Sequence, residues 1–490
     1  MASTSPRYAG LPTEVLENVF SYVNQHDLTN VVRVCKSFAL SGRLLLYRVV
    51  ELCSDDPHID ATLGLLRGER TLGVKVICAT LTTRRPLGGV LRGPWIEPDF
   101  FMYWTRLRRL ELKGFPFYTP ADIQLFDSTL RNCCTQLRQF TFRPVFGSLP
   151  SGGFQIGGLK KVSWQSELAT MDTPVTPIMM GSITTITHIT FLGRVTHRRG
   201  IPYDDFLKLR FPSLESLELG SLEHSNTEIR TNALVTTFIL AHPSIEHLSL
   251  GKIRPSYFIF QFDPEQLKPD SLPSLKRFEG YPENVTNLVR CRVRSIFSII
   301  SLSLCCPKEE GNHSRVLRAM SEAVADAEGT EKRFLFVKKL RFETYAVLNH
   351  RMRSDATSLA HHACMDELAH MCPNVVAWCG SLPPMNSVHF ARMFAMYEHL
   401  EIICLPLLST MLEMPSFPME YFKDIAETCK NLKFVVARRP DYTERPDHVF
   451  ILERDGTGTL IKVDCKLVQG VGIYYDRISD RINGPQDLSA

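Results

Sequence analysis

The densest group of side chains that could bind a metal ion lies between residues 361 and 379. Its members are His361, His362, Cys364, His370, Cys372 and Cys379. Thiolate and imidazole groups bind structural zinc, usually from closely spaced pairs such as C-x-x-C. This segment contains no such pair, and its spacings fit no common zinc module. We therefore expect no metal site, while a metal-dependent enzyme remains the alternative that this segment would support.

A second candidate for chemistry is the segment Asp455-Gly456-Thr457-Gly458-Thr459. It is similar to the phosphorylated-aspartate motif of P-type ATPases, where a carboxylate is the nucleophile and separate motifs hold magnesium and phosphate. No supporting motif accompanies it here. The flanking runs 448–453 and 459–463 favour a β-hairpin with a turn at Asp455. A nucleophile elbow, an H-E-x-x-H motif and a kinase signature are also absent from the sequence, so we predict a non-catalytic protein without a cofactor.

Composition restricts the classes of partner. The 490 residues carry 56 Lys and Arg against 52 Asp and Glu, a net charge of +4 without a strongly basic segment, so we expect no nucleic-acid partner. The longest nearly uncharged apolar run, 296–306, is shorter than the ~20 residues of a membrane helix, and the N-terminus lacks a secretory signal. We expect a soluble protein of the cytoplasm, the nucleus or both, without a membrane partner. Its 14 cysteines are then expected to be thiols.

Residues 11–50 have the pattern of three short helices. Pro12 favours the start of the first helix and Glu14 its first turn. Asp27 is expected to be the N-cap of the second helix, and a third helix would hold Phe38 and Leu40. Forty residues in three small helices cannot bury all of their apolar side chains among themselves. The excess must face either a partner or the next domain.

This segment resembles the F-box. The matching features are Leu11-Pro12, Glu14, the step Val19–Tyr22, Asp27-Leu28, the run Val34–Phe38 and Leu46-Tyr47. Phe38 is a departure, because the family often has Trp there. The resemblance implies that the three helices bind a Skp-type adaptor, which links to the cullin of a ubiquitin ligase. The residues then expected to contact the adaptor are Leu11, Pro12, Leu16, Phe20, Leu28, Val34, Cys35, Phe38, Leu46 and Tyr47.

The remaining chain contains a recurring frame of apolar residues at positions 0, +3 and +5, which is the strand pattern of a leucine-rich repeat. The frame begins at Leu107, Leu137, Leu159, Ile186, Leu214, Ile245, Leu275, Ile299, Val337, Val375, Leu400 and Leu432. The frames at Leu275 and Val375 end in glycine. Earlier members are expected at Tyr47/Val50/Leu52 and Val74/Ile77/Ala79. Pro-Ser or Pro-Asn precedes several frames, and proline would end the preceding helix there.

The spacing of the frames supports a repeat. Twelve frames from Leu107 to Leu432 give a mean period of about 29.5 residues, at the upper edge of the leucine-rich range. Intervening stretches such as 122–133, 232–241, 316–328 and 355–371 have helical spacing. We therefore predict an α+β protein: a small all-α F-box followed by an α/β leucine-rich-repeat solenoid, with a curved parallel sheet and outer helices.

The expected organisation has five parts. These are a disordered N-terminus at 1–10, the F-box at 11–50, a transition with degenerate repeats at 51–104, irregular repeats at 105–440 and a closing hairpin segment at 441–490. Irregular repeats after an F-box resemble the large F-box/leucine-rich-repeat class, in particular its fungal type. The predicted function is substrate recognition for an SCF-type ubiquitin ligase, with an unidentified protein target on the repeats. The alternatives are a non-degradative F-box scaffold and, through the segments 361–379 or 455–459, a metal- or phosphate-dependent enzyme.

Overall fold

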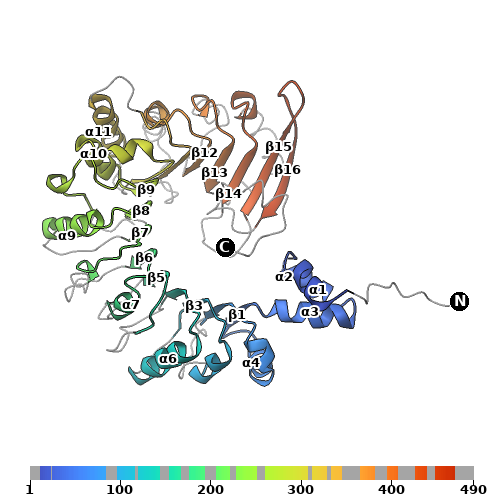
Figure 1. Cartoon of the computed structure of the whole chain (residues 1–490). Helices are drawn as coiled ribbons and strands as arrows, with labels where there is room; N and C mark the ends of the chain where they lie inside the picture. Colours follow the sequence, from blue (N-terminus) through green and yellow to red (C-terminus); the bar gives the residue numbers. More distant parts are fainter. Residues whose placement is uncertain are drawn as a thin grey trace. The chain divides into compact units, whose positions relative to one another are not determined.

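The computed structural model describes 15 ranges of the chain: 11–23, 25–83, 96–115, 120–143, 154–166, 176–193, 206–220, 228–250, 260–306, 312–327, 333–344, 365–380, 394–406, 425–438 and 447–468. The described residues form two compact units. The first extends to Leu214 and the second begins at Glu215. Figure 1 labels the helices and strands of both units. The segment 1–10, expected to be disordered, lies outside the described residues. No described helix is long and apolar enough to cross a membrane.

The first unit begins with three helices, α1 (Thr13–Phe20), α2 (Gln25–Val31) and α3 (Lys36–Leu46). Pro12 caps α1, and its carbonyl oxygen accepts hydrogen bonds from the N–H groups of Val15 and Leu16, both at 3.1 Å. The N-cap prediction for Asp27 is wrong. Helix α2 already starts at Gln25, so Asp27 lies in its first turn, where a carboxylate is favoured by the helix dipole.

Six strands follow in the first unit. They are β1 (Val49–Cys53), β2 (Cys78–Thr82), β3 (Arg109–Lys113), β4 (Gln139–Arg143), β5 (Lys161–Ser166) and β6 (His188–Gly193). Each strand pairs in parallel with the next one along the chain. The register aligns the +3 positions of the frames, so that Leu110, Phe140 and Val162 lie opposite one another.

The second unit continues the pattern with β7 (Ser216–Leu219), β8 (His247–Leu250), β9 (Arg277–Gly280), β10 (Ser301–Cys306), β11 (Lys339–Thr344), β12 (Ala377–Gly380), β13 (Ile402–Pro406) and β14 (Phe434–Arg438). These eight strands are parallel and again pair in chain order. Two antiparallel strands, β15 (Asp447–Arg454) and β16 (Leu460–Val468), complete the unit. The predicted α/β class with a mainly parallel sheet is confirmed for each unit.

In all twelve main frames the +3 and +5 residues lie in a strand, and the first residue, two positions before the strand, is buried in the core. The earlier frame Val74/Ile77/Ala79 is wrong. In the paired register Ala79 lies opposite Val50 and Leu110, which are +3 residues. The frame of β2 is therefore Val76/Ala79/Leu81, and these three side chains are at most 2% exposed. Alternating apolar residues at 74, 76, 77 and 79 satisfy both registers, and only the pairing of β2 with its neighbours distinguishes them.

The two frames that end in glycine have an aromatic residue at +3. In β12 a Cβ atom on Gly380 would collide with the backbone carbonyl oxygen of Phe342 and would lie 3.0 Å from Cη2 of Trp378. In β9 a Cβ atom on Gly280 would lie 3.0 Å from Cζ of Phe278. The neighbouring backbone thus leaves no room for a side chain at Gly380, and the Phe278 ring makes the space at Gly280 tight.

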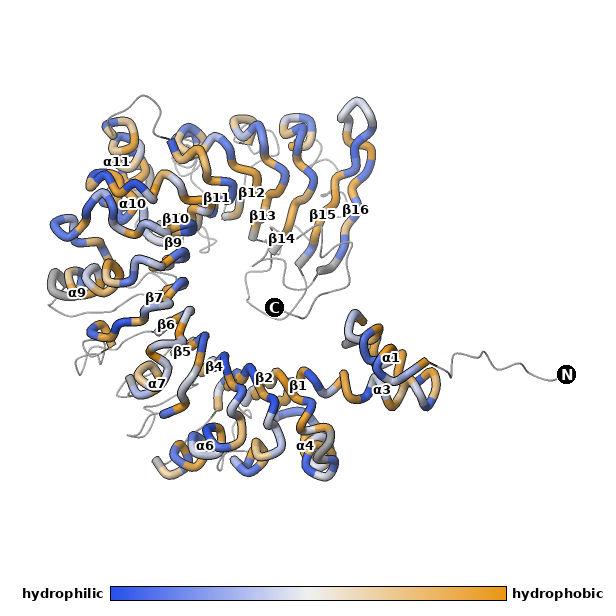
Figure 2. Tube along the Cα trace, in the orientation of Figure 1, coloured by the Kyte–Doolittle hydropathy of each residue, from blue (hydrophilic) through white to orange (hydrophobic). Residues whose placement is uncertain are grey.

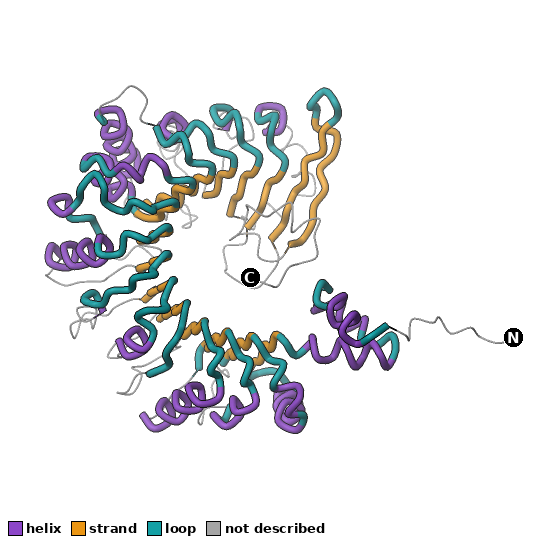
Figure 3. The backbone as a smooth tube through the Cα atoms, in the orientation of Figure 1, coloured by secondary structure: helices purple, strands orange, loops and turns teal. Residues whose placement is uncertain are grey.

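Helices cover one face of the strands in each unit (Figure 3). In the first unit they are α4 (Ile59–Gly68), α5 (Arg70–Gly73), η2 (Pro98–Tyr103), α6 (Pro120–Cys133) and α7 (Thr176–Gly181). In the second they are α9 (Glu228–Leu240), η3 (Pro264–Gln266), α10 (Pro282–Arg290), η4 (Arg294–Ser298) and α11 (Asn312–Asp326). The predicted helices 122–133, 232–241 and 316–328 correspond to α6, α9 and α11. Part of the predicted helix 355–371 lies outside the described residues, and 365–371 is helical.

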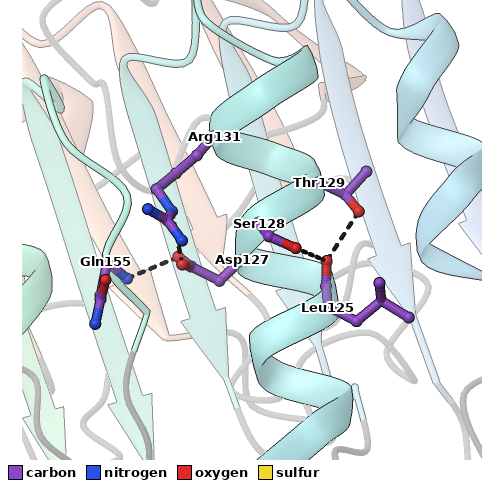
Figure 4. Close-up of polar contacts among 6 residues, drawn as sticks. All are labelled: Leu125, Asp127, Ser128, Thr129, Arg131 and Gln155. Atoms are coloured by element: carbon purple, nitrogen blue, oxygen red, sulfur yellow. Dashed lines mark hydrogen bonds and ion pairs between the residues drawn. The ribbon is translucent and has the colours of Figure 1, made fainter.

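Buried polar side chains connect the helices to the segment that precedes a later strand. Asp127 of α6, 3% exposed, accepts a hydrogen bond from the backbone N–H of Gln155 at 2.7 Å and forms an ion pair with Arg131 at 2.8 Å (Figure 4). Burial raises the pKa of Asp127, although both of these contacts oppose the shift. Asn284 of α10 has a similar role, bonding the N–H of Phe262 and the carbonyl oxygen of Phe260. These contacts satisfy backbone groups that the parallel sheet leaves unpaired.

The hairpin predicted near the C-terminus is confirmed. Strands β15 and β16 are antiparallel, and β15 pairs with β14, so the last parallel strand has a partner. The part of the predicted closing segment after Val468 lies outside the described residues. The proposed boundaries at residues 50, 104 and 440 remain predictions, although β1 starts at Val49, inside the range assigned to the first helical module.

Candidate adaptor-binding module

Three side chains form the core of the N-terminal helices. Leu16 and Phe20 of α1 and Leu28 of α2 are at most 5% exposed and pack together with partly buried neighbours that include Phe38. The rings of Phe20 and Phe38 meet edge to face, with centroids 5.1 Å apart. Gly42 of α3 is buried next to α2, and a Cβ atom there would lie 2.5 Å from Cγ1 of Val32. Close packing of the three helices thus requires both these buried apolar side chains and the glycine at position 42.

The structure divides the ten predicted contact residues into three groups according to exposure. The buried residues are Leu16, Phe20 and Leu28, the partly buried ones are Phe38, Leu46 and Tyr47, and the exposed ones are Leu11, Pro12, Val34 and Cys35. The buried group forms the core of the module, because Leu16 and Phe20, four residues apart on α1, pack against Leu28 of α2. The exposed group, with Val34 at 70% exposure, is available for contact with another protein.

Four further exposed apolar residues were missing from the predicted set. They are Val15, Val19, Tyr22 and Leu40, with Tyr22 69% and Leu40 72% exposed. Leu11, Val15, Val19 and Tyr22 follow one another at intervals of three or four residues, so they form one side of α1 and its flanking turns, which we call the α1 stripe. A helical wheel could have identified it. Residues 16 and 20 make one apolar face, and residues 15, 19 and 22 make a second, which a single core cannot also bury.

Exposed apolar side chains are concentrated in this module. Among the described residues, 15 large apolar residues are exposed, and six of them belong to this module: Leu11, Val15, Val19, Tyr22, Val34 and Leu40. Hydrophobic positions run along α1 and α3 (Figure 2). A contiguous apolar surface on a small helical module is typical of a protein–protein contact. The α1 stripe therefore has the chemistry of a docking surface.

The segment at Asp455 forms a turn. One carboxylate oxygen of Asp455 accepts hydrogen bonds from the hydroxyl of Thr457 at 2.6 Å and from the N–H groups of Thr457 and Thr459, both at 2.9 Å. These bonds, the Thr457 hydroxyl first, lower the pKa of Asp455. Gly458 has a φ of +86°, which favours glycine. The predicted β-turn between two strands is therefore confirmed, and the Asp455 carboxylate stabilises it through these hydrogen bonds.

The candidate metal ligands are separated in the described part of the chain. Cys372 is fully buried directly after the helical residues 365–371, whereas Cys379 of β12 belongs to a cluster with Cys404, Val436 and Val449. His361, His362 and Cys364 lie outside the described residues. Among the residues that the structure describes, no three His, Cys, Asp or Glu side chains come together as a metal site would require.

Cysteines at one position relative to the frames are core residues, as predicted. Cys134, Cys372 and Cys429 each stand three residues before the first apolar position of a frame, and all three are at most 5% exposed. Burial raises the pKa of Cys134 and of Cys429 to about 12, and that of Cys372 still further. A thiol in such surroundings behaves as a small hydrophobic group and a poor nucleophile.

Comparison with known proteins agrees with the geometry of the helical module. A family model described as F-box-like matches residues 8–49, close to the predicted range 11–50. No curated protein matches the chain. The chain thus carries an F-box-like domain at its N-terminus, and the match covers under a tenth of the 490 residues.

Proposed function

We propose that this protein is the target-binding subunit of an SCF-type ubiquitin ligase. Its F-box-like domain would bind a Skp-type adaptor and, through it, a cullin. The observation that supports this most directly is the exposed α1 stripe, together with Val34 and Leu40, on a module whose own core is already filled. F-box domains generally bind Skp-type adaptors, and apolar exposure of this kind is typical of a surface that binds another protein.

In this proposal the strands after residue 49 are leucine-rich repeats that hold a protein target. The frames repeat in register over β1–β6 and over β7–β14, and in each unit helices cover one face of the strands. The other face carries mainly polar residues on β1–β6 and on β7–β11, and it carries an apolar cluster around Cys404 and Val436 on β12–β15. A rigid repeat array raises the local concentration of a bound target near the ligase without catalytic groups of its own. The ubiquitin-transfer chemistry would belong to other subunits, so the chain itself is proposed to be non-catalytic.

Co-purification with a Skp-type adaptor tests the first part. The full-length chain should retain the adaptor, and the double variant Leu11→Ala, Pro12→Ala should lose it, because Leu11 lies on the stripe and Pro12 begins α1. Retention of the adaptor by a folded double variant would refute the F-box assignment.

The second part is tested in two steps. Proximity labelling identifies the proteins that bind the chain, and their half-lives are then measured with and without the F-box. Targets whose half-life depends on the F-box support the ligase function. Targets that bind the repeats equally well but whose half-life is independent of the F-box would instead indicate a non-degradative scaffold.

A further inference from the structure

One face of the strands in the first unit carries a cluster of charges around a buried carboxylate. Along β3, Arg109, Glu111 and Lys113 alternate with the buried Leu110 and Leu112, so their side chains project from the face opposite the helices. The register places Thr141 of β4 beside Glu111 and Arg143 beside Lys113. The face of β3 and β4 therefore brings together residues that are about thirty positions apart in the chain.

Glu111 contacts three cations at once. Its Oε1 lies 3.2 Å from Nη2 of Arg143 and 3.8 Å from Nζ of Lys113, and its Oε2 lies 3.7 Å from Nη2 of Arg109. The Glu111 side chain is 7% exposed, whereas those of Arg109 and Arg143 are 44% and 45% exposed. One buried carboxylate thus holds three cationic groups together, and they keep much of their surface for another molecule.

The cluster has excess positive charge. Lys161 of β5, which is exposed, stands in register beside Gln139. On β3–β5 the four cations therefore exceed Glu111 by three charges, and Glu51 of β1 reduces the excess on the whole face of β1–β5 to two. The neutral residues in the same rows include the hydroxyls of Thr80 and Thr141. These hydroxyls can also donate to an anion.

We propose that this face, defined by Arg109, Glu111, Lys113, Arg143 and Lys161 and here called the basic face, binds an acidic segment of the target protein. Arg109 and Lys113 are four residues apart on one strand, about 13 Å, and β3 to β5 span about 10 Å. An extended peptide of about four residues with two or three negative groups would fit these dimensions. The inference rests on the proposed function of the strands as a target-binding array and adds the chemical class of the target.

The charge balance favours a peptide over a nucleic acid. A duplex presents one negative charge per ~1.7 Å and is bound by surfaces with many cations. The basic face has a surplus of only two or three charges, and a carboxylate stands at its centre. Glu111 would repel a dense polyanion, whereas an acidic peptide can place its few charges on the flanking arginines and lysines.

Fluorescence anisotropy on the full-length chain tests the proposal with three labelled eight-residue peptides. One alternates glutamate and serine, one has phosphoserine at the serines, and one has lysine at the glutamates. We expect binding of the glutamate peptide, the phosphoserine peptide or both, weakening with salt, and none of the lysine peptide. Binding of the phosphoserine peptide alone identifies phosphate as the required anion, and binding of both identifies charge alone; either result supports the proposal.

Variants locate the site. Arg143→Gln should weaken binding about fivefold, the effect of losing one partly exposed charge contact, and Arg143→Glu with Lys113→Glu should weaken it more than twentyfold. Lys433→Glu is the matched control, because Lys433 is 57% exposed and lies in the second unit, where its partner is Glu401. It should change the affinity less than twofold.

The proposal is overturned if neither acidic peptide binds, if Lys433→Glu weakens binding as much as Arg143→Glu with Lys113→Glu, or if a 20-nucleotide RNA binds tenfold more tightly than both peptides. Arg143→Gln keeps the test valid if the charge-reversed variant fails to fold. Co-purification of each variant with the adaptor is measured in parallel. Loss of peptide binding with the adaptor retained contradicts only the basic face, whereas loss of the adaptor from the unmodified chain contradicts the F-box proposal.

Discussion

A negative charge on the exposed side of α1 should prevent adaptor binding and leave the helical module folded. Val19 is the most suitable position. Its side chain is 52% exposed and lies in the middle of the α1 stripe, whereas the next residue, Phe20, is 5% exposed and belongs to the core. A substitution at Val19 is therefore expected to affect adaptor binding, whereas one at Phe20 is expected to affect folding, so Val19→Asp tests binding alone.

The expected magnitude follows from the exposed area. Complete burial of a valine is worth about 1.5–3 kcal/mol, and half of the Val19 surface is still available, so Val19→Ala should cost about 1 kcal/mol, or a fivefold weaker affinity. Val19→Asp also places an unpaired carboxylate in an apolar contact, which costs several kcal/mol more. We therefore expect the affinity to fall more than a hundredfold.

Isothermal titration of the full-length chain with a Skp-type adaptor measures the affinity, and circular dichroism measures the helical content. Leu125→Asp is the matched control, because Leu125 is 57% exposed on α6 and points away from the buried contacts of that helix (Figure 4). It removes a similar apolar area and adds the same charge, but it should change the affinity less than twofold. Phe20→Ala should instead lower the stability of the module by about 3–5 kcal/mol.

Two results would contradict this prediction. If Val19→Asp binds the adaptor as tightly as the unmodified chain, the α1 stripe is not the docking surface. If Val19→Asp loses helical content to the same extent as Phe20→Ala, the exposed position is part of the fold, and its effect on binding is indirect.

Three further predictions concern the two units. Gly380→Ala should lower the free energy of unfolding by about 1–3 kcal/mol in urea denaturation, because its Cβ atom collides with the Phe342 backbone. Relative to Asp127→Asn, the unmodified chain should become more stable as the pH falls from 7 toward 3.8. The raised pKa means that the folded state binds this proton more tightly than the unfolded state does. In native buffer, iodoacetamide should modify the exposed Cys35 and leave the buried Cys372 unmodified, as peptide mass spectrometry would detect.

Each of these has its own check. A Cβ atom added to Gly64 on α4 would contact nothing within 4 Å, so Gly64→Ala should be neutral or stabilising, and equal losses at Gly64 and Gly380 would contradict the steric argument. For Asp127, a constant stability difference between pH 7 and 4 would show that burial does not raise its pKa. Rapid modification of Cys372 without unfolding would show that its surroundings open readily.

Much of the strand pattern could be predicted because each strand buries the same three positions of its frame. A residue at 0 or +3 must be apolar to cover the helix side of the sheet, and the +5 residue is apolar except for the glycines of β9 and β12. The frame of β2 could not be predicted, since both Val74 and Val76 begin an apolar series. Only the pairing of Ala79 with Leu110 distinguishes them.

The same distinction applies to the functional residues. The F-box pattern identified the module and most of its apolar positions, but a list of apolar residues does not separate Phe20, which packs inside, from Val19, which faces outward. That separation depends on which side of α1 meets α2 and α3. Helical periodicity shows that α1 has two apolar faces, but only the packing of the three helices shows which of the two is buried.

The helical F-box-like module, the strand frames and the terminal hairpin can all be predicted from the order of the residues, because each depends on residues near one another in the chain. Which side chains of different strands come into contact depends on the tertiary structure. Glu111 and Arg143 are separated by 32 positions, yet parallel strands lie about 4.8 Å apart, and pairing brings the two side chains within 3.2 Å. A charge cluster of this kind is a product of register, and register depends on the whole sheet.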